Sequence, residues 1–214
     1  MKYEKSRKKV IHFSRMLSEE GYFGPRSGTG GNVSVLTEDG AAIAVTPSGR
    51  SYHQLLPQDI CILNPDDGSL LEGQLSPSIE TGMHLAVYRN RGDAGAVIHT
   101  HQTFASIFAL INHPIPPLFD EVTLHLGDTI EVVPYAISGS KQLEQNVVEK
   151  LNNGCSCYLL QNHGALTVAS SLQEAYSKVE LMEKCSQVYY YALTTGKEIT
   201  TLPEDSIRVL TEDS

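Results

Sequence analysis

Two histidines stand two residues apart at the end of an apolar run, in the stretch AGAVIHTHQTFA at residues 94–105. Residues i and i+2 of a strand point to the same face about 7 Å apart, so the imidazoles of His99 and His101 can converge on one ion. A third histidine, His163, follows another apolar run and precedes a glycine. Each histidine alone also fits a hydrogen-bonded core residue. Three imidazoles together, with no thiolate nearby, favour a catalytic zinc site with an open coordination position.

A carboxylate that could act beside such an ion is Glu80, in the segment SPSIETGMHLAVYRN at residues 76–90. It could serve there as a base or as a fourth metal ligand. The alternative is that Glu80 only complements the positive end of a helix. His84 lies one helical turn further on and precedes an apolar run. We interpret His84 as a packing or supporting residue and not as a ligand.

Three segments are candidates for binding an anion. Gly30-Gly31-Asn32 and Ser48-Gly49 offer backbone N–H groups that side chains leave open, and Ser78 offers a hydroxyl where a helix is expected to begin. Each segment is a weak signal alone, because GTGGN is not a dinucleotide fingerprint and TPSG is an ordinary turn. Their joint occurrence with the histidines makes them informative.

The elements that must position these residues alternate irregularly along the chain. Apolar periodicity predicts helices over residues 2–20, 76–90 and 140–154 and from residue 171 onward. Ser76 and Pro77 fit a helix start, and Ser171 to Glu174 fit a capping box. Short turns between several strands favour a mixed sheet layered with helices, in one domain over residues 1–214. Residues 28–49 are expected to form a glycine loop, a strand, a turn, a second strand and another loop, and further strands are expected at residues 60–63, 96–99, 129–133, 157–160 and 165–168.

Composition limits the classes of function. The formal net charge is −9 and the pI is near 5.3, and the one dense basic run, KSRKK at residues 5–9, fits a solvated helix face. Binding to nucleic acid is therefore not expected. No segment reaches the roughly 18 apolar residues of a membrane span, and no signal peptide is recognisable. The four cysteines are interpreted as buried free thiols, so we expect a cytoplasmic protein.

The chain resembles the class II aldolase/adducin-head family, and within it the L-fuculose-1-phosphate aldolase branch. The matching segments are GTGGNVSV, TPSG, PSIE, HTH, VVPYA followed by GS, and NHG. They occur in the family's order and extend over nearly the whole chain. No one segment is decisive, but the ordered set is specific.

The resemblance implies a three-layer α/β/α fold with a mostly antiparallel central sheet, assembled as a C4 homotetramer with active sites between subunits. It implies one Zn²⁺ per chain, held by His99, His101, His163 and, in the resting enzyme, Glu80, which also serves as acid and base. The implied reaction cleaves a ketose 1-phosphate between C3 and C4 to dihydroxyacetone phosphate and an aldehyde, with the metal as Lewis acid. The phosphate-binding positions of the family fall on Gly31, Asn32, Ser48, Gly49 and Ser78.

Two departures from the family's pattern bear on the chemistry. The family often reads Pro-Ser-Ser-Glu, and here Ile79 replaces the second serine, which removes one potential phosphate ligand. The fuculose-phosphate enzymes carry a tyrosine that acts from a neighbouring subunit, where this chain has Phe119, Asp120 and Glu121. We hypothesise that Asp120 or Glu121 supplies this second acid. The alternative is that both are water-exposed surface carboxylates.

Other reactions on the same scaffold stay open. Sugar-phosphate 4-epimerases share the retro-aldol step, and decarboxylases are a further alternative. Methylthioribulose-1-phosphate dehydratases have a catalytic glutamate near Glu121 but lack a carboxylate at the position of Glu80. A non-catalytic adducin-like interaction module is least favoured, because all three histidines and the glutamate are present. The sequence therefore favours a zinc-dependent aldolase acting on L-fuculose 1-phosphate or a related deoxy-ketose phosphate.

Overall fold

The centre of the computed structural model, which describes residues 1–25 and 28–212, is an eight-stranded sheet. The strand order is β4-β3-β2-β1-β5-β8-β7-β6. Neighbouring strands run antiparallel, except for the parallel pair β6 and β7. The expected mostly antiparallel sheet is confirmed. The strands are β1 (Asn32–Leu36), β2 (Ile43–Val45), β3 (Cys61–Leu63), β4 (Leu70–Glu72), β5 (Ala96–Thr100), β6 (Val132–Val133), β7 (Cys157–Leu160) and β8 (Gly164–Ala169).

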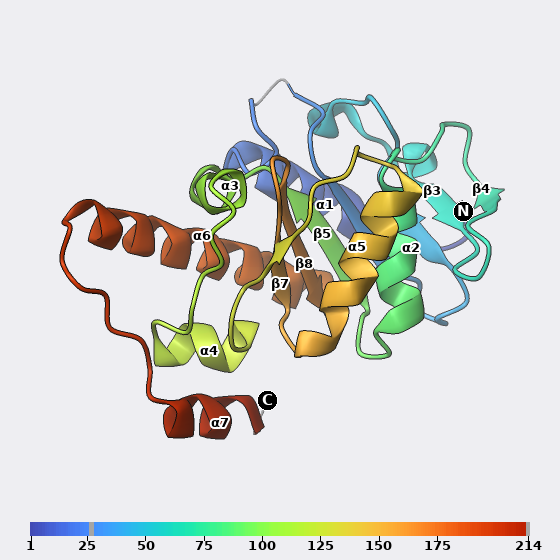
Figure 1. Ribbon diagram of the computed structural model, residues 1–214. Coiled ribbons are helices and arrows are strands. Elements are labelled where there is room, and N and C mark those ends of the chain that lie inside the picture. The colour runs from blue at the N-terminus through green and yellow to red at the C-terminus, as the bar shows by residue number, and fades with distance from the viewer. Residues whose placement is uncertain (26–27, 213–214) are drawn as a thin grey trace.

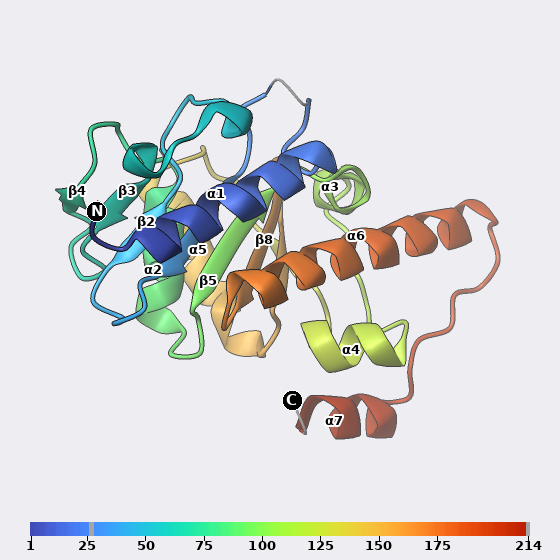
Figure 2. The same ribbon diagram turned by 180° about the vertical axis from the view of Figure 1, so that it is seen from behind.

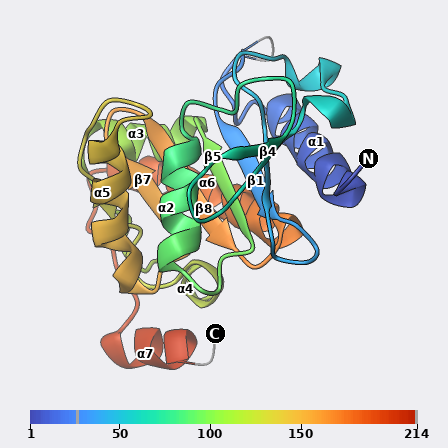
Figure 3. The ribbon, with the colours of Figure 1, turned by 90° about the vertical axis from the view of Figure 1, so that its right-hand side faces the viewer.

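Helices cover both faces of this sheet, so the fold has the three expected layers. α2 (Thr81–Asn90) and α5 (Lys141–Lys150) lie side by side on one face (Figure 1). The other face carries α1 (Glu4–Glu19) and α6 (Leu172–Thr194), seen in Figure 2, and the view in Figure 3 shows α1 and α2 on opposite sides. α3 (Thr103–Leu110) and α4 (Asp120–Leu126) pack against α6, and α7 (Glu204–Glu212) packs against α4. Short 3₁₀ helices η1 (Tyr52–Gln54), η2 (Pro57–Asp59) and η3 (Leu151–Asn153) complete the described elements.

The central strands are buried on both faces because each face of the sheet has its own core. In β5, Ile98 belongs to the core beneath α1 and α6, whereas Val97 belongs to the core beneath α2 and α5. The alternation continues in β8, where Ala165 faces α3 and α6 and Leu166 faces α2 and α5. Covering both faces explains why these strands read as nearly continuous apolar runs. It also means that a polar residue in them points into a protein layer.

Three predicted helices are confirmed with their ends. α1 ends at Glu19, next to Gly21, and the hydroxyl of Ser140 caps α5 by accepting the N–H of Leu143. The hydroxyl of Ser171 likewise caps α6 by accepting the N–H of Glu174. Only half of the expected capping box forms there, because the carboxylate of Glu174 bonds to Ser170 instead.

The predicted helix start at Ser76 and Pro77 is wrong, because α2 begins at Thr81. Pro77 instead pairs with Pro47 in an isolated antiparallel bridge, and the N–H of Ser78 donates to Thr46 O at 3.1 Å. These bonds hold the chain extended up to Ser78, and a turn at Ile79 and Glu80 then leads into α2. The strand expected over residues 129–133 is also shorter and consists of Val132 and Val133 only.

One residue of the basic run at 5–9 is not solvated. The guanidinium of Arg7 is 2% exposed, pairs with Glu72 at 2.8 Å and donates to the carbonyl oxygens of Pro57 and Ile60. Arg7 therefore joins α1 to η2 and to β4 at the edge of the sheet. Among the described residues, no helix is long and apolar enough to cross a membrane.

Replacing Arg7 with methionine should lower the free energy of unfolding by about 1–3 kcal/mol, because the buried carbonyl oxygen of Ile60 loses its side-chain donor and Glu72 loses its partner. Urea denaturation measures the change. The matched control is Lys9→Met, at an exposed position on the same helix, which should shift the free energy by less than about 0.5 kcal/mol. Equal effects of the two substitutions would contradict this role of Arg7.

Candidate metal centre

Three imidazoles meet at one end of the sheet. His99 is the fourth residue of β5 and pairs with Asn32 of β1 and Leu166 of β8, and His101 follows the same strand. His163 lies in the turn between β7 and β8. The ring centroids lie 4.6–5.4 Å apart, and one nitrogen from each ring lies within 4.8 Å of the others. The structure therefore brings together the three histidines that the sequence singles out.

The carboxylate of Glu80 points at two of these rings. Its Oε2 lies 3.2 Å from Nε2 of His99, and its Oε1 lies 3.1 Å from Nε2 of His163. The amide of Asn32 donates to Oε2 at 2.9 Å. Burial raises the pKa of Glu80, but the imidazoles of His99 and His163 outweigh it and hold that pKa well below its usual range. A negative charge thus faces the imidazole cluster at neutral pH.

A group outside the cluster orients the imidazole of His99, and another holds the backbone of His101. Nδ1 of His99 lies 2.8 Å from Ala165 O, which leaves Nε2 directed at Glu80. A backbone carbonyl on one ring nitrogen is the usual way in which a metal-binding histidine is oriented. The backbone N–H of His101 donates to Tyr22 O at 2.7 Å. Burial, with the charges of His99 and His163, lowers the pKa of His101 to about 4, so this ring is neutral as a metal ligand must be.

This set of groups fits a divalent metal ion. Glu80 Oε1 is buried and accepts no well-formed hydrogen bond from the described residues, so a ligand-binding lone pair is available. Three imidazole nitrogens with one carboxylate oxygen and no thiolate match the ligands of a catalytic zinc site. The four cysteines lie in the core as free buried thiols.

Glycines allow the backbone to come this close to the imidazoles. A Cβ on Gly164 would lie 2.2 Å from Thr100 O and 2.8 Å from Cδ2 of His101. Gly31 has φ +69°, and a Cβ there would lie 2.2 Å from the ring of Phe23. Neither position can carry a side chain without moving its neighbours, which explains the glycines of GTGGN and NHG.

The three predicted anion loops lie together beside the metal centre. The hydroxyl of Tyr52 donates to Gly31 O at 2.6 Å and so ties the glycine loop to the segment after β2. The N–H of Ser48 donates to Ser76 O at 2.9 Å, which ties that segment to the approach to α2. The N–H groups of Gly31 and Gly49 have no partner in the described part of the chain and are available to an anion.

Other predicted phosphate groups are engaged within the protein. The N–H groups of Ser48 and Ser78 are bonded to the backbone, so these two residues can offer a ligand only their hydroxyls. Ser78 Oγ accepts the N–H of Glu80 at 3.4 Å, and the amide of Asn32 is directed at Glu80. Phosphate binding by these residues stays a prediction.

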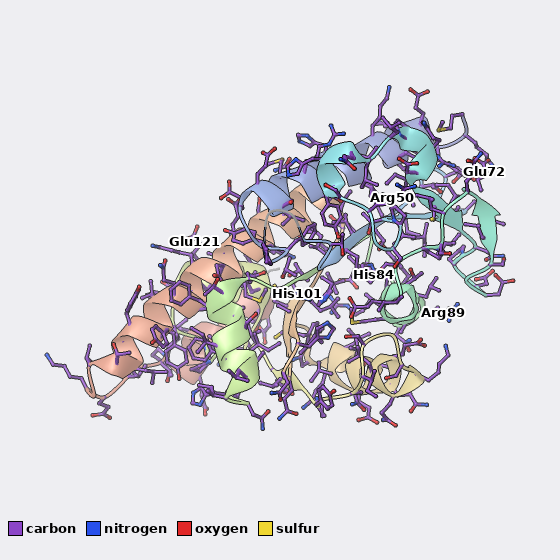
Figure 4. The ribbon with its side chains drawn as sticks, turned by 90° about the horizontal axis from the view of Figure 1, so that it is seen from above. Arg50, Glu72, His84, Arg89, His101 and Glu121 are labelled. Atoms are coloured by element: carbon purple, nitrogen blue, oxygen red, sulfur yellow. The ribbon has the colours of Figure 1, made fainter. Side chains whose placement is uncertain are left out.

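Asp120 and Glu121 do not join the histidines. Both are exposed in the first turn of α4, and Glu121 lines a groove with Asp93 and Ser170. Those two residues flank β5 and β8 at the end of the sheet opposite the metal centre. Seen from above, His84 and His101 lie near the centre of the molecule and Glu121 lies apart from them (Figure 4). These carboxylates could serve such a centre only in another copy of the chain.

Sequence reasoning missed several residues that contact the candidate ligands or the glycine loop. Tyr52 fixes the glycine loop, and Ser138 Oγ lies 3.3 Å from Nε2 of His163. Ser34, also missed, lies 2.7 Å from His84, which the sequence analysis interprets as a packing or supporting residue. The inward-facing polar alternation of Asn32 and Ser34 in β1 was a usable signal, whereas nothing local marks Tyr52 or Ser138.

Comparison with known proteins agrees with this geometry. Residues 8–190 match the model of the Class II Aldolase and Adducin N-terminal domain family. The chain is 33% identical over 210 residues to 5-deoxy-D-ribulose 1-phosphate aldolase of Bacillus thuringiensis serovar kurstaki, covering 98% of this chain and 95% of that protein. It is 32% identical over 189 residues to L-fuculose phosphate aldolase of Escherichia coli K12, covering 88% and 86%. A solved structure of L-fuculose 1-phosphate aldolase superposes with a TM-score of 0.88 at 31% identity, covering 98% and 95%.

The chain therefore belongs to the class II aldolase and adducin N-terminal domain family, and it is an enzyme of the metal-dependent aldehyde-lyase class. The fold is the class II aldolase fold, as the structural match shows. The resemblance found in the ordered sequence segments is confirmed.

Substituting Gly164 with alanine should lower the affinity for a divalent metal about tenfold or more, because the new methyl group displaces His101 and misplaced ligand support costs about 10–100-fold. Titration with Co²⁺, followed by its visible absorption, measures the affinity. Gly92→Ala is the matched control, since a Cβ there meets nothing within 4 Å. A folded Gly164→Ala protein with unchanged affinity would refute the close approach described here.

Proposed function

We propose that this protein is a zinc-dependent aldolase that cleaves a short or deoxy ketose 1-phosphate into dihydroxyacetone phosphate and an aldehyde. Residues 1–214 act as one domain, and one Zn²⁺ per chain is held by His99, His101, His163 and Glu80. The similarity to a 5-deoxy-D-ribulose 1-phosphate aldolase and to L-fuculose phosphate aldolases supports this substrate class. L-Fuculose 1-phosphate and its deoxy-pentulose counterpart are the leading candidates.

The observation that carries the proposal is the position of Glu80 between two imidazoles. A carboxylate 3.1 and 3.2 Å from the Nε2 atoms of His163 and His99 can ligate the ion that they hold, and can also leave it to move a proton. When bound, zinc supplies a Lewis acid that stabilises the negative charge developing on the substrate's oxygens. The methylthioribulose-1-phosphate dehydratases lack a carboxylate at this position, so its presence favours carbon–carbon cleavage.

Two proton transfers must accompany the cleavage. The hydroxyl on C4 loses its proton as the C3–C4 bond breaks, and the bonding electrons remain on C3, which then takes up a proton. Glu80 is placed to carry the proton at C3, because its carboxylate is buried at the metal centre with one oxygen free of hydrogen bonds. A second acid–base group is needed at the C4 oxygen.

The phosphate is assigned to the three joined loops. The free N–H groups of Gly31 and Gly49, the hydroxyls of Ser48 and Ser78 and the amide of Asn32 would bind its oxygens. Anchoring the phosphate beside the metal centre would place the reacting carbons and so lower the entropic cost of reaching the transition state. Ile79, which is 68% exposed, offers no hydroxyl for this purpose.

The second acid is assigned to Asp120 or Glu121 of a neighbouring subunit in a cytoplasmic homotetramer. Both are exposed in the first turn of α4, remote from the metal centre of their own chain, so a catalytic role for either would require action on another chain. The partners are thus further copies of the chain and a small sugar phosphate.

Product analysis by NMR tests the reaction. Zinc-loaded protein should convert L-fuculose 1-phosphate or 5-deoxyribulose 1-phosphate to dihydroxyacetone phosphate and an aldehyde, and should not release products from ribulose 5-phosphate or methylthioribulose 1-phosphate. A C4 epimer, a dehydrated product or a decarboxylation product without cleavage would assign the chain to another reaction on this scaffold.

Converting the second acid to its amide should reduce kcat at least about 100-fold, the usual contribution of one acid–base group. The variants are Asp120→Asn and Glu121→Gln, tested separately by steady-state turnover. Asp66→Asn, an exposed carboxylate in the β3–β4 turn, is the control and should leave turnover unchanged. Normal rates for both α4 variants would exclude a role for either carboxylate.

A further inference from the structure

Strand β1 carries two polar side chains on a face that is covered by protein. Val33 and Val35 belong to the core beneath α1 and α6, so the alternating residues Asn32 and Ser34 face the layer of α2. Both are buried, Asn32 to 2% and Ser34 to 0% exposure. Burying polar groups lowers the stability of the fold unless they are hydrogen-bonded, so Asn32 and Ser34 are expected to have partners.

The partners are Glu80, at the N-cap position of α2, and His84, four residues further along the chain. Asn32 donates to Glu80 at 2.9 Å, and Ser34 Oγ lies 2.7 Å from Nδ1 of His84. Two residues along a strand span about 6.6 Å and four residues along a helix span about 6 Å, so the two contacts form parallel rungs between β1 and α2. His84 is fully buried and is not among the three clustered histidines.

Three buried polar atoms belonging to these rungs have no hydrogen-bond partner in the described part of the chain. They are Asn32 Oδ1, Glu80 Oε1 and His84 Nε2. A carboxylate only accepts hydrogen bonds, so Asn32 must turn its NH₂ to Glu80 and its Oδ1 away. Glu80 Oε1 faces the metal centre. The other two atoms, the acceptor Asn32 Oδ1 and the ring nitrogen His84 Nε2, belong to neighbouring contacts between β1 and α2.

The hydrogen bonds on the Nδ1 side of His84 determine which ring nitrogen carries the proton. Ser34 Oγ also lies 2.9 Å from the hydroxyl of Tyr88. If Tyr88 donates to Ser34, then Ser34 donates to Nδ1 of His84, and the single proton of the neutral ring lies on Nε2. Burial, together with the charge of His99, lowers the pKa of His84 to about 3, which is consistent with a neutral ring.

We propose that His84 is a positioning residue, whose Nε2–H holds Asn32 Oδ1 through one buried water and thereby keeps the Asn32 amide directed at Glu80. A buried site lined by polar groups is where proteins retain such a water. The chain Tyr88–Ser34–His84–Asn32 then fixes the orientation of the Glu80 carboxylate. This role rests on the proposed metal function of Glu80. His84 itself would touch neither metal nor substrate and would act only through Asn32.

The tautomer of His84 is the first test. Nitrogen-15 NMR of the wild-type protein should show the proton on Nε2 and an unprotonated Nδ1. Ser34→Ala should change these shifts, because it removes the donor to Nδ1. A proton on Nδ1 in the wild-type protein would overturn the proposal, and this result needs no variant to fold.

Metal affinity is the second test, with Co²⁺ as the probe and its visible absorption as the readout. His84→Leu should weaken Co²⁺ binding about 10–100-fold, the usual cost of losing support behind a ligand. His84→Gln keeps a donor near the position of Nε2 and should lose less. Because His84 acts through Asn32, the Asn32→Ala/His84→Leu double variant should bind no more weakly than the worse single variant.

A control separates positioning from a general loss of packing. Ser186→Ala removes an equally buried hydroxyl that bonds only within α6, and it should leave the Co²⁺ affinity unchanged. Unchanged affinity in a folded His84→Leu protein, or fully additive effects in the double variant, would overturn the role of His84 alone. Failure of the wild-type protein to bind Co²⁺ would instead overturn the proposed metal function, and the role of His84 with it.

Discussion

The placement of one buried carboxylate among three imidazoles is the constraint on which the rest of this molecule depends. Glu80 is 6% exposed, and an ionised carboxylate at that depth is destabilising unless charge and hydrogen bonds compensate for its lost hydration. The Nε2 atoms of His99 and His163 lie 3.2 and 3.1 Å from its oxygens, and the amide of Asn32 supplies a hydrogen bond. Since one carboxylate oxygen still has no well-formed hydrogen bond, a bound cation would complete the balance.

Much of the surrounding structure follows from that placement. The extended segment before α2 delays the helix until Thr81, so that Glu80 lies at its first turn against the ends of β1 and β5. Gly31 and Gly164 let the backbone approach the rings. The anion loops and the proposed water-linked chain behind Asn32 attach to the same few residues. The groups proposed to bind metal and phosphate and to transfer a proton are thereby concentrated at one end of the sheet, while Asp120 and Glu121 lie toward the other.

The sequence was a good guide to the long elements and to the ligands, and a poor one to the connections. α1, α5 and α6 have strong periodicity and clear ends, and the histidines were recognisable from strand spacing. α3, α4, α7 and β4 were not predicted, because each is at most nine residues long and too short for a clear local periodicity. Ser76 and Pro77 are residue types that favour a helix start, but Pro77 pairs with Pro47 and the helix begins later.

X-ray absorption spectroscopy of the zinc-loaded protein is the most direct test of the central claim. It reports the number and type of atoms bound to the ion. Four light-atom ligands, three of them imidazole nitrogens, at about 2.0–2.2 Å are the expected result for the resting protein. The Glu80→Gln variant should keep the three imidazoles and change only the oxygen contribution. A sulfur ligand at about 2.3 Å, or fewer than three imidazoles, would contradict a metal centre built from His99, His101, His163 and Glu80.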